Sequence, residues 1–428
     1  MNIRIKELKS SKLFQDSVSA ILGNGLGNAF LLIAGIIIAR FLGRDLYGEY
    51  GLVKTTMLYI GVFASFGLGT TATKFIASAV NDAHCYLNSL IRDILFITLG
   101  FSSLLALLLL LFATHIAEFL EDPNLTTPLR FLGPIIISAS INKAQYGILG
   151  GFKKYKTIAS NNVISSFLML VLACFATYYY GLWGSLSALL ISQVINAVLN
   201  FFSLQRIRNT LLNQQRKTNY STLIKFSFPI ALQDFSYTLT NWGGSLIIVK
   251  FSSMGQLGIF TASSQWQSIV LMIPSLLVNV ILSHLSSAAN DDRRQISLIK
   301  RLLSVNFLCT FIPFIIVYFA APYVIRLYGI SFSGMTDILR ILVFSSIFMC
   351  CSNVFNSALI SRGKNWILFS SRIFRDMLLL GLTYYLIQAL GRDTGAMDYA
   401  IASVITSIIY FLIVGTLTFH SIRVKQDT

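Results

Sequence analysis

Charged side chains are scarce in this sequence. Asp, Glu, Lys and Arg make up 12% of the 428 residues, whereas hydrophobic residues make up 55% and the mean hydropathy is +0.71. A soluble domain carries about 25% charged residues, because its surface faces water. The composition therefore excludes an ordinary soluble protein and indicates an integral membrane protein, in which lipid covers much of the surface.

The sequence also lacks the motifs of common enzyme classes. It has no Walker-type phosphate loop, no His-x-x-x-His, no Asp-x-Asp pair and no Ser/His/Asp set. The glycine-rich stretch 23–27 falls within an apolar helix, where glycines serve close packing or kinks. The longest connections expected outside the cell, 115–130 and 321–337, hold about 16 residues each, too few for the catalytic domain of a glycan polymerase or ligase. We therefore expect no enzyme, no cofactor and no metal site.

Acidic residues are about half as common as basic ones. The chain has 17 Asp and Glu against 33 Lys and Arg, which gives a formal net charge of +16. Nucleic-acid binding is one cause of such an excess, but cytoplasmic loops of membrane proteins also accumulate Lys and Arg. Four of the five cysteines fall inside apolar runs, as packing residues do. We interpret the basic excess as a sign of membrane topology and expect no nucleic-acid partner.

Apolar runs long enough to cross a bilayer recur along the whole chain. A transmembrane helix needs about 20 mostly apolar residues. Lys and Arg concentrate at the two termini and in every second connection between runs, which places both termini in the cytoplasm. The runs predict twelve transmembrane helices, at residues 15–41, 50–76, 90–114, 129–151, 157–180, 183–204, 226–250, 258–282, 302–320, 337–360, 366–390 and 398–420.

The twelve predicted helices divide into two halves of six. Residues 205–225 form the longest hydrophilic connection and are basic, so we interpret them as a cytoplasmic linker between an N-terminal lobe, 1–204, and a C-terminal lobe, 226–428. A shift of 210 residues aligns Gly48 with Gly258, each at the turn from the first to the second helix of its half. Parallel repeats of this kind are related by an axis along the membrane normal, with a substrate path between them.

Ionisable side chains inside a span are costly, and they mark functional sites unless they have another partner. Lys143 precedes Lys153, at the cytoplasmic end of the fourth predicted helix, by ten residues, which is about 15 Å along an α-helix. An ammonium group at that depth does not reach the interface comfortably. Lys143 is therefore predicted to be either a cation in a substrate cavity or one member of a buried structural pair.

Three further cations are candidates for the same cavity. Lys54 and Lys74 lie near the two ends of the second predicted helix, where snorkelling to the interface is the alternative. In the eleventh predicted helix, Arg372 and Asp376 are four residues apart and can form a structural pair on one face. Such a pair would leave Arg375 free to point into the cavity.

Carboxylates are fewer inside the predicted spans. Asp234 lies in the seventh predicted helix, where it could couple transport to an ion or neutralise one of the cations. Because the candidate cations outnumber the carboxylates, the predicted cavity favours an anionic head group, such as a phosphate or diphosphate. Coulomb attraction strengthens where water is excluded, so a cationic drug would fit this cavity poorly.

Three stretches carry a resemblance to a known family: ARFLGRDLYGEY at 39–50, GLGTTATKFIA at 67–77 and QYGILGGFKK at 145–154. They resemble Wzx-type polysaccharide repeat-unit (O-antigen) flippases, in the polysaccharide transport branch of the MATE-like MOP superfamily. The resemblance implies an all-α membrane fold with two six-helix lobes around a V-shaped cavity. Lys74 matches a recurring basic position of the family. Lipid II flippases of the same superfamily usually have fourteen helices, two more than predicted here.

The resemblance also implies a function, a location and partners. The protein would transfer an undecaprenyl-diphosphate-linked oligosaccharide from the cytoplasmic to the periplasmic leaflet of the bacterial inner membrane, by alternating access. A polysaccharide polymerase and the chain-length machinery are its expected partners beyond the lipid bilayer. The alternative is a MATE-type, cation-coupled antiporter of small molecules. That alternative needs an acidic site in the first or seventh helix, for which Asp234 is the candidate.

Overall fold

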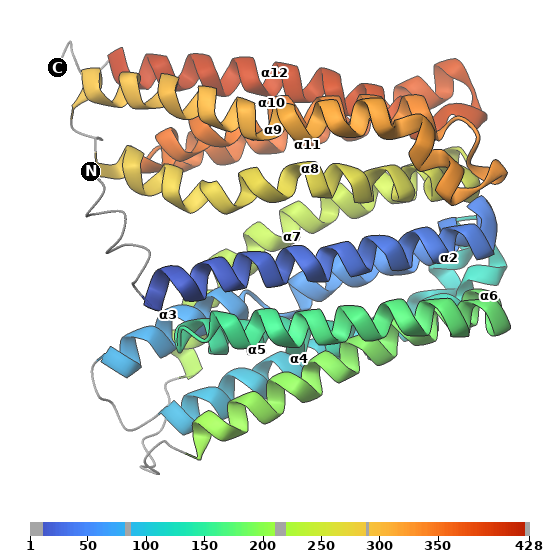
Figure 1. The fold of residues 1–428 in the computed structure, drawn as a ribbon, viewed down its shortest axis with the longest axis horizontal. Helices are drawn as coiled ribbons and strands as arrows, with labels where there is room; N and C mark the ends of the chain where they lie inside the picture. Colours follow the sequence, from blue (N-terminus) through green and yellow to red (C-terminus); the bar gives the residue numbers. More distant parts are fainter. Residues whose placement is uncertain (1–11, 82–86, 210–219, 288–290, 424–428) are drawn as a thin grey trace. The chain divides into compact units, whose positions relative to one another are not determined.

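The computed structural model describes residues 12–81, 87–209, 220–287 and 291–423, and this part is almost entirely helical (Figure 1). The predicted all-α fold class is confirmed. The chain termini and residues 210–219 of the predicted linker lie outside the described residues. The α-helices are α2 (Lys12–Ala64), α3 (Leu68–Asn81), α4 (Leu87–Phe119), α5 (Thr126–Gly151), α6 (Tyr155–Arg208), α7 (Tyr220–Phe251), α8 (Met254–Ser287), α9 (Asp292–Tyr328), α10 (Met335–Ser361), α11 (Asn365–Leu390) and α12 (Gly395–Arg423).

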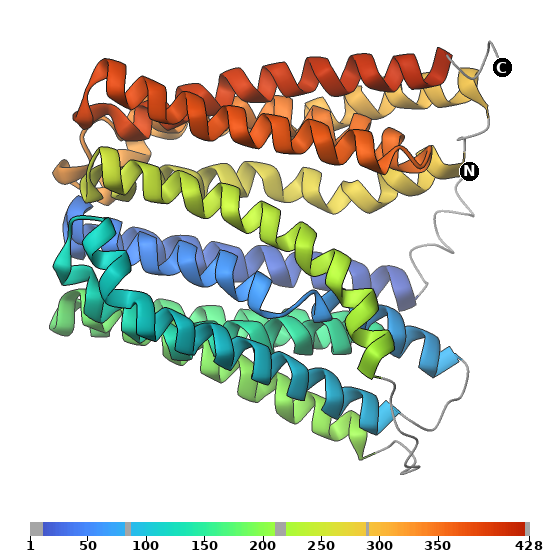
Figure 2. The same ribbon diagram turned by 180° about the vertical axis from the view of Figure 1, so that it is seen from behind.

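Two of these helices are sharply bent and each contains more than one predicted span. α2 has 53 residues and α6 has 54, so each would be about 80 Å long if straight, against a hydrocarbon core of about 30 Å. Both turn at a glycine with positive φ, Gly43 (φ 71°) in α2 and Gly181 (φ 54°) in α6. With these bends, eleven of the twelve predicted spans each fall within one helical segment. Figures 1 and 2 show the helices from opposite sides.

The second predicted span is broken rather than continuous, which corrects the predicted helix at 50–76. α2 ends at Ala64 and α3 begins at Leu68, because Phe66 (φ 52°) and Gly67 (φ 65°) both adopt left-handed conformations that end the helical hydrogen-bond ladder. Around the break, side-chain hydroxyl groups donate hydrogen bonds to backbone carbonyl groups. Ser140 Oγ, from α5, donates to the Gly61 carbonyl at 3.2 Å, and Thr71 Oγ1 donates to the Gly67 carbonyl at 3.1 Å. Hydrogen bonds of this kind make a broken helix tolerable in a membrane.

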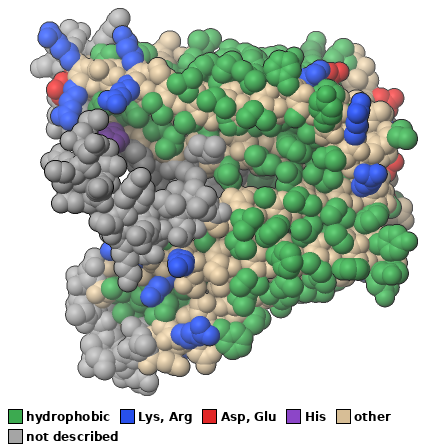
Figure 3. Space-filling model, viewed as in Figure 1, with side chains coloured by type: hydrophobic (Ala, Val, Ile, Leu, Met, Phe, Trp, Pro, Cys, Tyr) green, Lys and Arg blue, Asp and Glu red, His purple; other side chains and the backbone are tan. Residues whose placement is uncertain are grey.

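Large apolar side chains are exposed along several helices, as expected where lipid is the solvent. By length and hydropathy, seven of the described helices could each cross a membrane. On α4, 70% of Phe96 and 61% of Leu111 are exposed, and on α9, 69% of Phe319 is exposed. In the face drawn in Figure 3, hydrophobic side chains cover most of the helix surfaces, and Lys and Arg lie mainly toward the helix ends.

Contacts between helices divide the chain into two compact units. The first unit comprises Met1–Leu42 and Glu49–Trp242. Within it, α5 packs against α3, α4 and α6, and the core includes the fully buried Leu68, Ile94 and Ile148. The glycines of α5 allow the close approach of α3, because a methyl group on Gly147 would overlap the Gly69 carbonyl. Two of the stretches that carry the family resemblance, 67–77 and 145–154, therefore lie against each other.

The second unit comprises Gly43–Gly48 and Gly243–Thr428. Its central helix is α10, which packs against α8, α9 and α12, around a core that includes Ile299, Val354 and Val414. The helix pattern of the first unit recurs here, since α10 has the central place that α5 has in the first. The predicted lobe boundaries at 204 and 226 stay a prediction.

Backbone details recur at the 210-residue offset found in the sequence. Within the second unit, a methyl group on Gly48 would overlap the carbonyl oxygen of Met254, and a methyl group on Gly258 would overlap that of Arg44. Gly48 lies 210 residues before Gly258, and Arg44 lies 210 residues before Met254. The two contacts therefore join equivalent positions of the two halves. A reciprocal contact between equivalent positions is what a local two-fold relationship produces.

The turns after α5 and α10 show the same offset. The backbone N–H of Lys154 and that of Lys364 each donate to the carbonyl five residues earlier, at 2.9 and 3.0 Å. Further along, Gly181 and Gly391 both have positive φ and both precede the last span of their half. The offset is constant from the second helix of each half to the sixth, which supports an internal repeat.

Candidate substrate pocket

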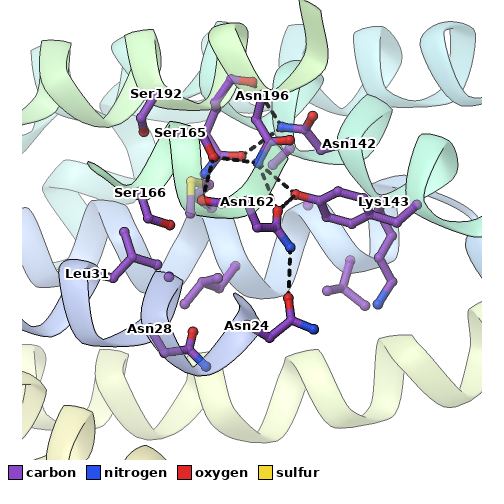
Figure 4. A pocket seen from close by; sticks show the side chains of 18 residues that line it. Asn24, Asn28, Leu31, Asn142, Lys143, Asn162, Ser165, Ser166, Ser192 and Asn196 are labelled. Carbon is purple, nitrogen blue, oxygen red and sulfur yellow. Dashed lines mark hydrogen bonds between the residues drawn. The ribbon is translucent and has the colours of Figure 1, made fainter. Parts of the chain in front are cut away.

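A pocket of about 280 Å³ lies within the first unit, between α2, α5 and α6 (Figure 4). Neutral polar side chains dominate its polar lining, and its 18 lining residues include one cation, Lys143, and no Asp or Glu. The amides and hydroxyls are Asn24, Asn28, Asn142, Asn162, Gln193, Asn196, Tyr146, Ser165, Ser166 and Ser192.

Helical spacing explains why these side chains converge. Asn24 and Asn28 are four residues apart on α2, and Asn142 and Tyr146 are four apart on α5, so each pair shares one helix face. The bend of α6 at Gly181 makes its two arms antiparallel neighbours, and both arms contribute lining residues. The pocket is therefore built by side chains on rigid helices rather than on loops.

A hydrogen-bond network crosses the pocket wall and fixes the amides (Figure 4). The Asn196 side-chain N–H group lies 2.7 Å from Tyr146 Oη, 2.9 Å from Ser165 Oγ and 3.1 Å from Asn162 Oδ1. The Tyr146 hydroxyl donates to Asn162 Oδ1. Asn162 Nδ2 in turn donates to Asn24 Oδ1 at 3.3 Å, which links α6 to α2. The amide orientations are thus set by one another before any ligand arrives.

Asn142 contributes a buried acceptor that the protein leaves unused. Its Nδ2 donates to the backbone carbonyl of Gln193 at 3.0 Å and to Gln193 Oε1 at 2.9 Å. Its Oδ1 is buried and accepts no hydrogen bond from any described residue, and the same holds for Oε1 of nearby Gln145. A buried acceptor without a donor costs about 1–3 kcal/mol, so a buried water at Asn142 Oδ1 would be favourable.

Lys143 lies at the edge of the pocket. Its side chain is exposed, and it forms no ion pair with a described carboxylate. Its aliphatic part packs on α3, because a methyl group on Gly69 would lie 3.3 Å from Lys143 Cγ. Lys143 is therefore held beside the break between α2 and α3. A substrate role for it stays a prediction.

The structure does not bring the other predicted cations of the first unit into this pocket. Lys74 is exposed on α3, with Nζ 3.9 Å from the ring centroid of Phe226 in α7. Lys54 is half-buried on α2, with Nζ 6.0 Å from the ring centroid of Tyr50. Asp234 lies within α7, but its side chain lies outside the described part of the structure. The transport roles assigned to these three residues stay predictions.

Arg375 is engaged by its sequence neighbour, which corrects the expectation that it is free. Its Nε donates to Asp376 Oδ1 at 2.8 Å, and its guanidinium forms an ion pair with the same carboxylate. The guanidinium also lies 5.0 Å from the ring centroid of Tyr410. The long arginine side chain folds back along α11, which spacing rules for helix faces do not anticipate. The Arg372–Asp376 pair and a substrate role for Arg375 stay predictions.

The charged residues of the spans do not reveal the amide pocket. The sequence does carry a signal for it, since polar amides recur at helical spacing in the apolar runs, as with Asn24 and Asn28 or Asn196 and Asn200. Asp398, at the first turn of α12, is likewise not among the predicted site residues. That carboxylate is fully buried, accepts a hydrogen bond from Thr394 Oγ1 at 2.7 Å through Oδ2, and leaves Oδ1 without a described donor.

Sequence comparisons point to glycan assembly. A family model described as "Polysaccharide biosynthesis protein" matches residues 37–337. An uncharacterized membrane protein of Methanocaldococcus jannaschii is 25% identical over 433 residues, covering 97% of this chain and 99% of that protein. The succinoglycan biosynthesis transport protein ExoT of Rhizobium meliloti is 21% identical over 395 residues, covering 89% of this chain and 73% of ExoT.

Solved structures share the fold. A MATE family multidrug resistance transporter of the MOP superfamily, in an inward-facing conformation, matches with a TM-score of 0.77 at 16% identity, covering 94% of this chain and 98% of that chain. A MOP superfamily transporter from Pyrococcus furiosus matches with a TM-score of 0.64 at 15% identity, covering 96% of each chain. These likenesses confirm the predicted MATE-like membrane fold, while the V-shaped cavity stays a prediction.

Proposed function

We propose a substrate and a mechanism for this chain, which belongs to the polysaccharide biosynthesis protein family. It is a flippase that transfers an undecaprenyl-diphosphate-linked oligosaccharide, the repeat unit of O-antigen or a similar surface glycan, from the cytoplasmic to the periplasmic leaflet. Its place is the bacterial inner membrane, with both termini in the cytoplasm. A polysaccharide polymerase and the chain-length machinery then act on the transferred unit.

The lining of the first-unit pocket is the observation that carries this proposal. A lipid-linked glycan has two kinds of polar group, the anionic diphosphate and the neutral sugar hydroxyls. The pocket offers one exposed cation, Lys143, beside a wall of amides and hydroxyls without a carboxylate. Within a membrane, a cation attracts a diphosphate strongly because little water screens the charges.

The mechanism is alternating access of the two lobes, with the polyprenyl tail remaining in the bilayer. Lys143 holds the diphosphate, and Lys74 and Arg375 are the further cations assigned to its path. The position of Lys143 beside the α2–α3 break supports this role, since transporter sites lie typically at interrupted helices. Asp234 is the residue to test for coupling to a proton or sodium gradient.

A cation-coupled drug antiporter is the rival function, and the pocket disfavours it. A cationic substrate or a coupling cation is held best by carboxylates, since cation binding in low dielectric needs an opposite charge. None of the 18 lining residues is Asp or Glu. The cation that is present would repel such a substrate.

The test is gene deletion followed by complementation with Lys143→Ala. Deletion should abolish surface glycan and trap undecaprenyl-linked repeat units on the cytoplasmic side, measured by mass spectrometry of extracted lipids. Loss of a charge-assisted contact costs about 1.5–3 kcal/mol, so Lys143→Ala should lower flipping roughly 10- to 100-fold. Wild type should restore the surface glycan.

Lys156→Ala is the matched control, because Lys156 is an exposed cation at the start of α6 that does not line the pocket. It should complement fully, and immunoblots should show equal amounts of both variants in the membrane. Unchanged surface glycan after deletion would reject the flippase. Full complementation by Lys143→Ala would retain the flippase and remove Lys143 from its binding site.

A further inference from the structure

The amides of the first-unit pocket match one class of ligand group particularly well. Each Asn or Gln side chain offers two N–H donors and an acceptor oxygen, and each sugar hydroxyl likewise donates and accepts. An ionised group would find a matching charge only at Lys143 on the pocket edge. Neutral hydroxyl-bearing rings are therefore the chemistry that the wall recognises.

We infer that this pocket is a glycan subsite, in which Asn24 and Asn162 hydrogen-bond uncharged sugar rings while the diphosphate stays outside at Lys143. The inference rests on the proposed function and specifies which part of the substrate enters the pocket. The volume of about 280 Å³ lies at the lower end of small-molecule pockets, about 300–1,000 Å³. The pocket therefore takes the ring or rings next to the diphosphate rather than the whole oligosaccharide.

The preset network supports a role in recognition rather than in packing alone. Asn162 is held by Tyr146 and Asn196 on one side and reaches Asn24 on the other, so its amide is oriented without a ligand.

The C-terminal half of the sequence shows that the repeat does not require neutral residues at these positions. At the 210-residue offset, Asp234 corresponds to Asn24, Arg372 to Asn162, Arg375 to Ser165 and Asp376 to Ser166. Four uncharged pocket positions thus have ionisable counterparts, whereas others, such as Asn28 (Thr238) and Asn196 (Thr406), do not. The backbone equivalence of the two halves, seen in their turns, makes the comparison one of like positions. Neutrality is therefore a specific property of the first-unit pocket.

Binding measurements with two lipids test the inference. The first probe is the lipid-linked glycan extracted from the deletion strain, and the second is undecaprenyl diphosphate without sugar. Dissociation constants are measured for the purified full-length protein in detergent, by microscale thermophoresis. Wild type should prefer the glycan lipid. Asn162→Ala should reduce that preference about five- to tenfold, as expected for the loss of a pair of hydrogen bonds, while its affinity for undecaprenyl diphosphate stays unchanged.

Asn24→Ala is the second variant, because this side chain is exposed at the pocket and its removal does not threaten folding. It should shift the preference in the same direction. Gln256→Ala removes an amide outside the pocket and should change neither constant. Lys143→Ala should weaken the binding of both lipids about equally.

The outcomes separate the inference from the function on which it rests. If no lipid-linked glycan accumulates in the deletion strain, the proposed function fails and the subsite falls with it. If the glycan lipid accumulates but Asn162→Ala and Asn24→Ala leave the preference intact, or weaken both lipids equally, the flippase stands and the glycan subsite is overturned.

Discussion

Arg362 shows how the second unit holds a charge away from solvent. Its side chain is 6% exposed and forms an ion pair with Asp292, which is 16% exposed. Its Nε donates to Gln295 Oε1 at 2.6 Å, and its Nη1 donates to the Ser421 carbonyl at 2.9 Å. One guanidinium therefore joins the end of α10 to the start of α9 and the end of α12.

Arg362→Ala should destabilise the protein strongly. Removing one member of a buried pair leaves the other charge uncompensated, at a cost of about 3–5 kcal/mol. We expect a clear fall in the thermal unfolding temperature of the detergent-purified protein, followed by tryptophan fluorescence.

Arg340→Ala provides the comparison. Arg340 pairs with Asp337 at 3.7 Å, but these side chains are 30% and 67% exposed, and such pairs contribute about 0–1 kcal/mol. Its unfolding temperature should stay close to that of wild type. Equal effects of the two variants would contradict the role given to burial.

At the residue scale, the depth of Lys143 is predictable from its distance to the helix end, and the side chain lies at the edge of a pocket, while its substrate role stays a prediction. The pairing of Arg375 with Asp376 is not predictable, because adjacent residues do not share a helix face and the conformation of a flexible side chain decides the contact. The amide cluster is not predictable from the sequence, because the hydrogen-bond partners of an Asn in a span lie on helices that are distant in sequence.

At the scale of elements, α3 and α5 make a close backbone contact in the first unit. The two backbones touch at Gly69 and Gly147, and Thr73 Oγ1 crosses from α3 to donate to the Gly147 carbonyl at 3.0 Å. Small residues are what allow helices to approach this closely in membranes. Any side chain at Gly147 would push the helices apart.

Gly147→Ala should therefore lower the stability of the first unit by about 1–3 kcal/mol, the range for overpacking a tight core. The check is the fraction of protein that stays monodisperse on size-exclusion chromatography after heating in detergent. Gly100→Ala in α4 is the control, since a methyl group there meets no heavy atom within 4 Å. Comparable losses for both variants would refute the close-contact explanation.

Helix positions were predictable because the apolar runs are long and their length is set by the bilayer. The break at Phe66 and Gly67 was not predictable, since the run of apolar residues continues through it. One of the contacts at the break is tertiary, since Ser140 of α5 donates to a carbonyl near the end of α2. Hydropathy carries no information on such partners.

At the scale of the whole molecule, the repeat gives each half its own set of turns. The turns at Lys154 and Lys364 share one hydrogen-bond geometry, and in the predicted topology both face the cytoplasm. The connection at Ser331, between α9 and α10, is predicted to face outward. The alternation of basic and non-basic connections therefore predicts the membrane topology of the entire chain, and cysteine labelling can test it.

Single cysteines placed in a cysteine-free background should report this topology. Ser331→Cys should react with a membrane-impermeant maleimide in intact spheroplasts, whereas Lys364→Cys should react only after permeabilisation. Both positions are exposed, so access to the reagent depends on the side of the membrane. The background requires replacement of Cys85, Cys174, Cys309, Cys350 and Cys351. Labelling of Lys364→Cys in intact spheroplasts would invert or break the predicted topology.

The break between α2 and α3 has a mechanical consequence. The helical ladder that would make one rod of this span is interrupted at Phe66 and Gly67, while backbone contact fastens α3 to α5 at Gly147. α5 contacts the chain on both sides of the break, at Gly61 of α2 and at Gly69 of α3. A rotation of α5 would therefore act on two separate helices rather than on one continuous rod, and Lys143 lies on α5 between these two contacts.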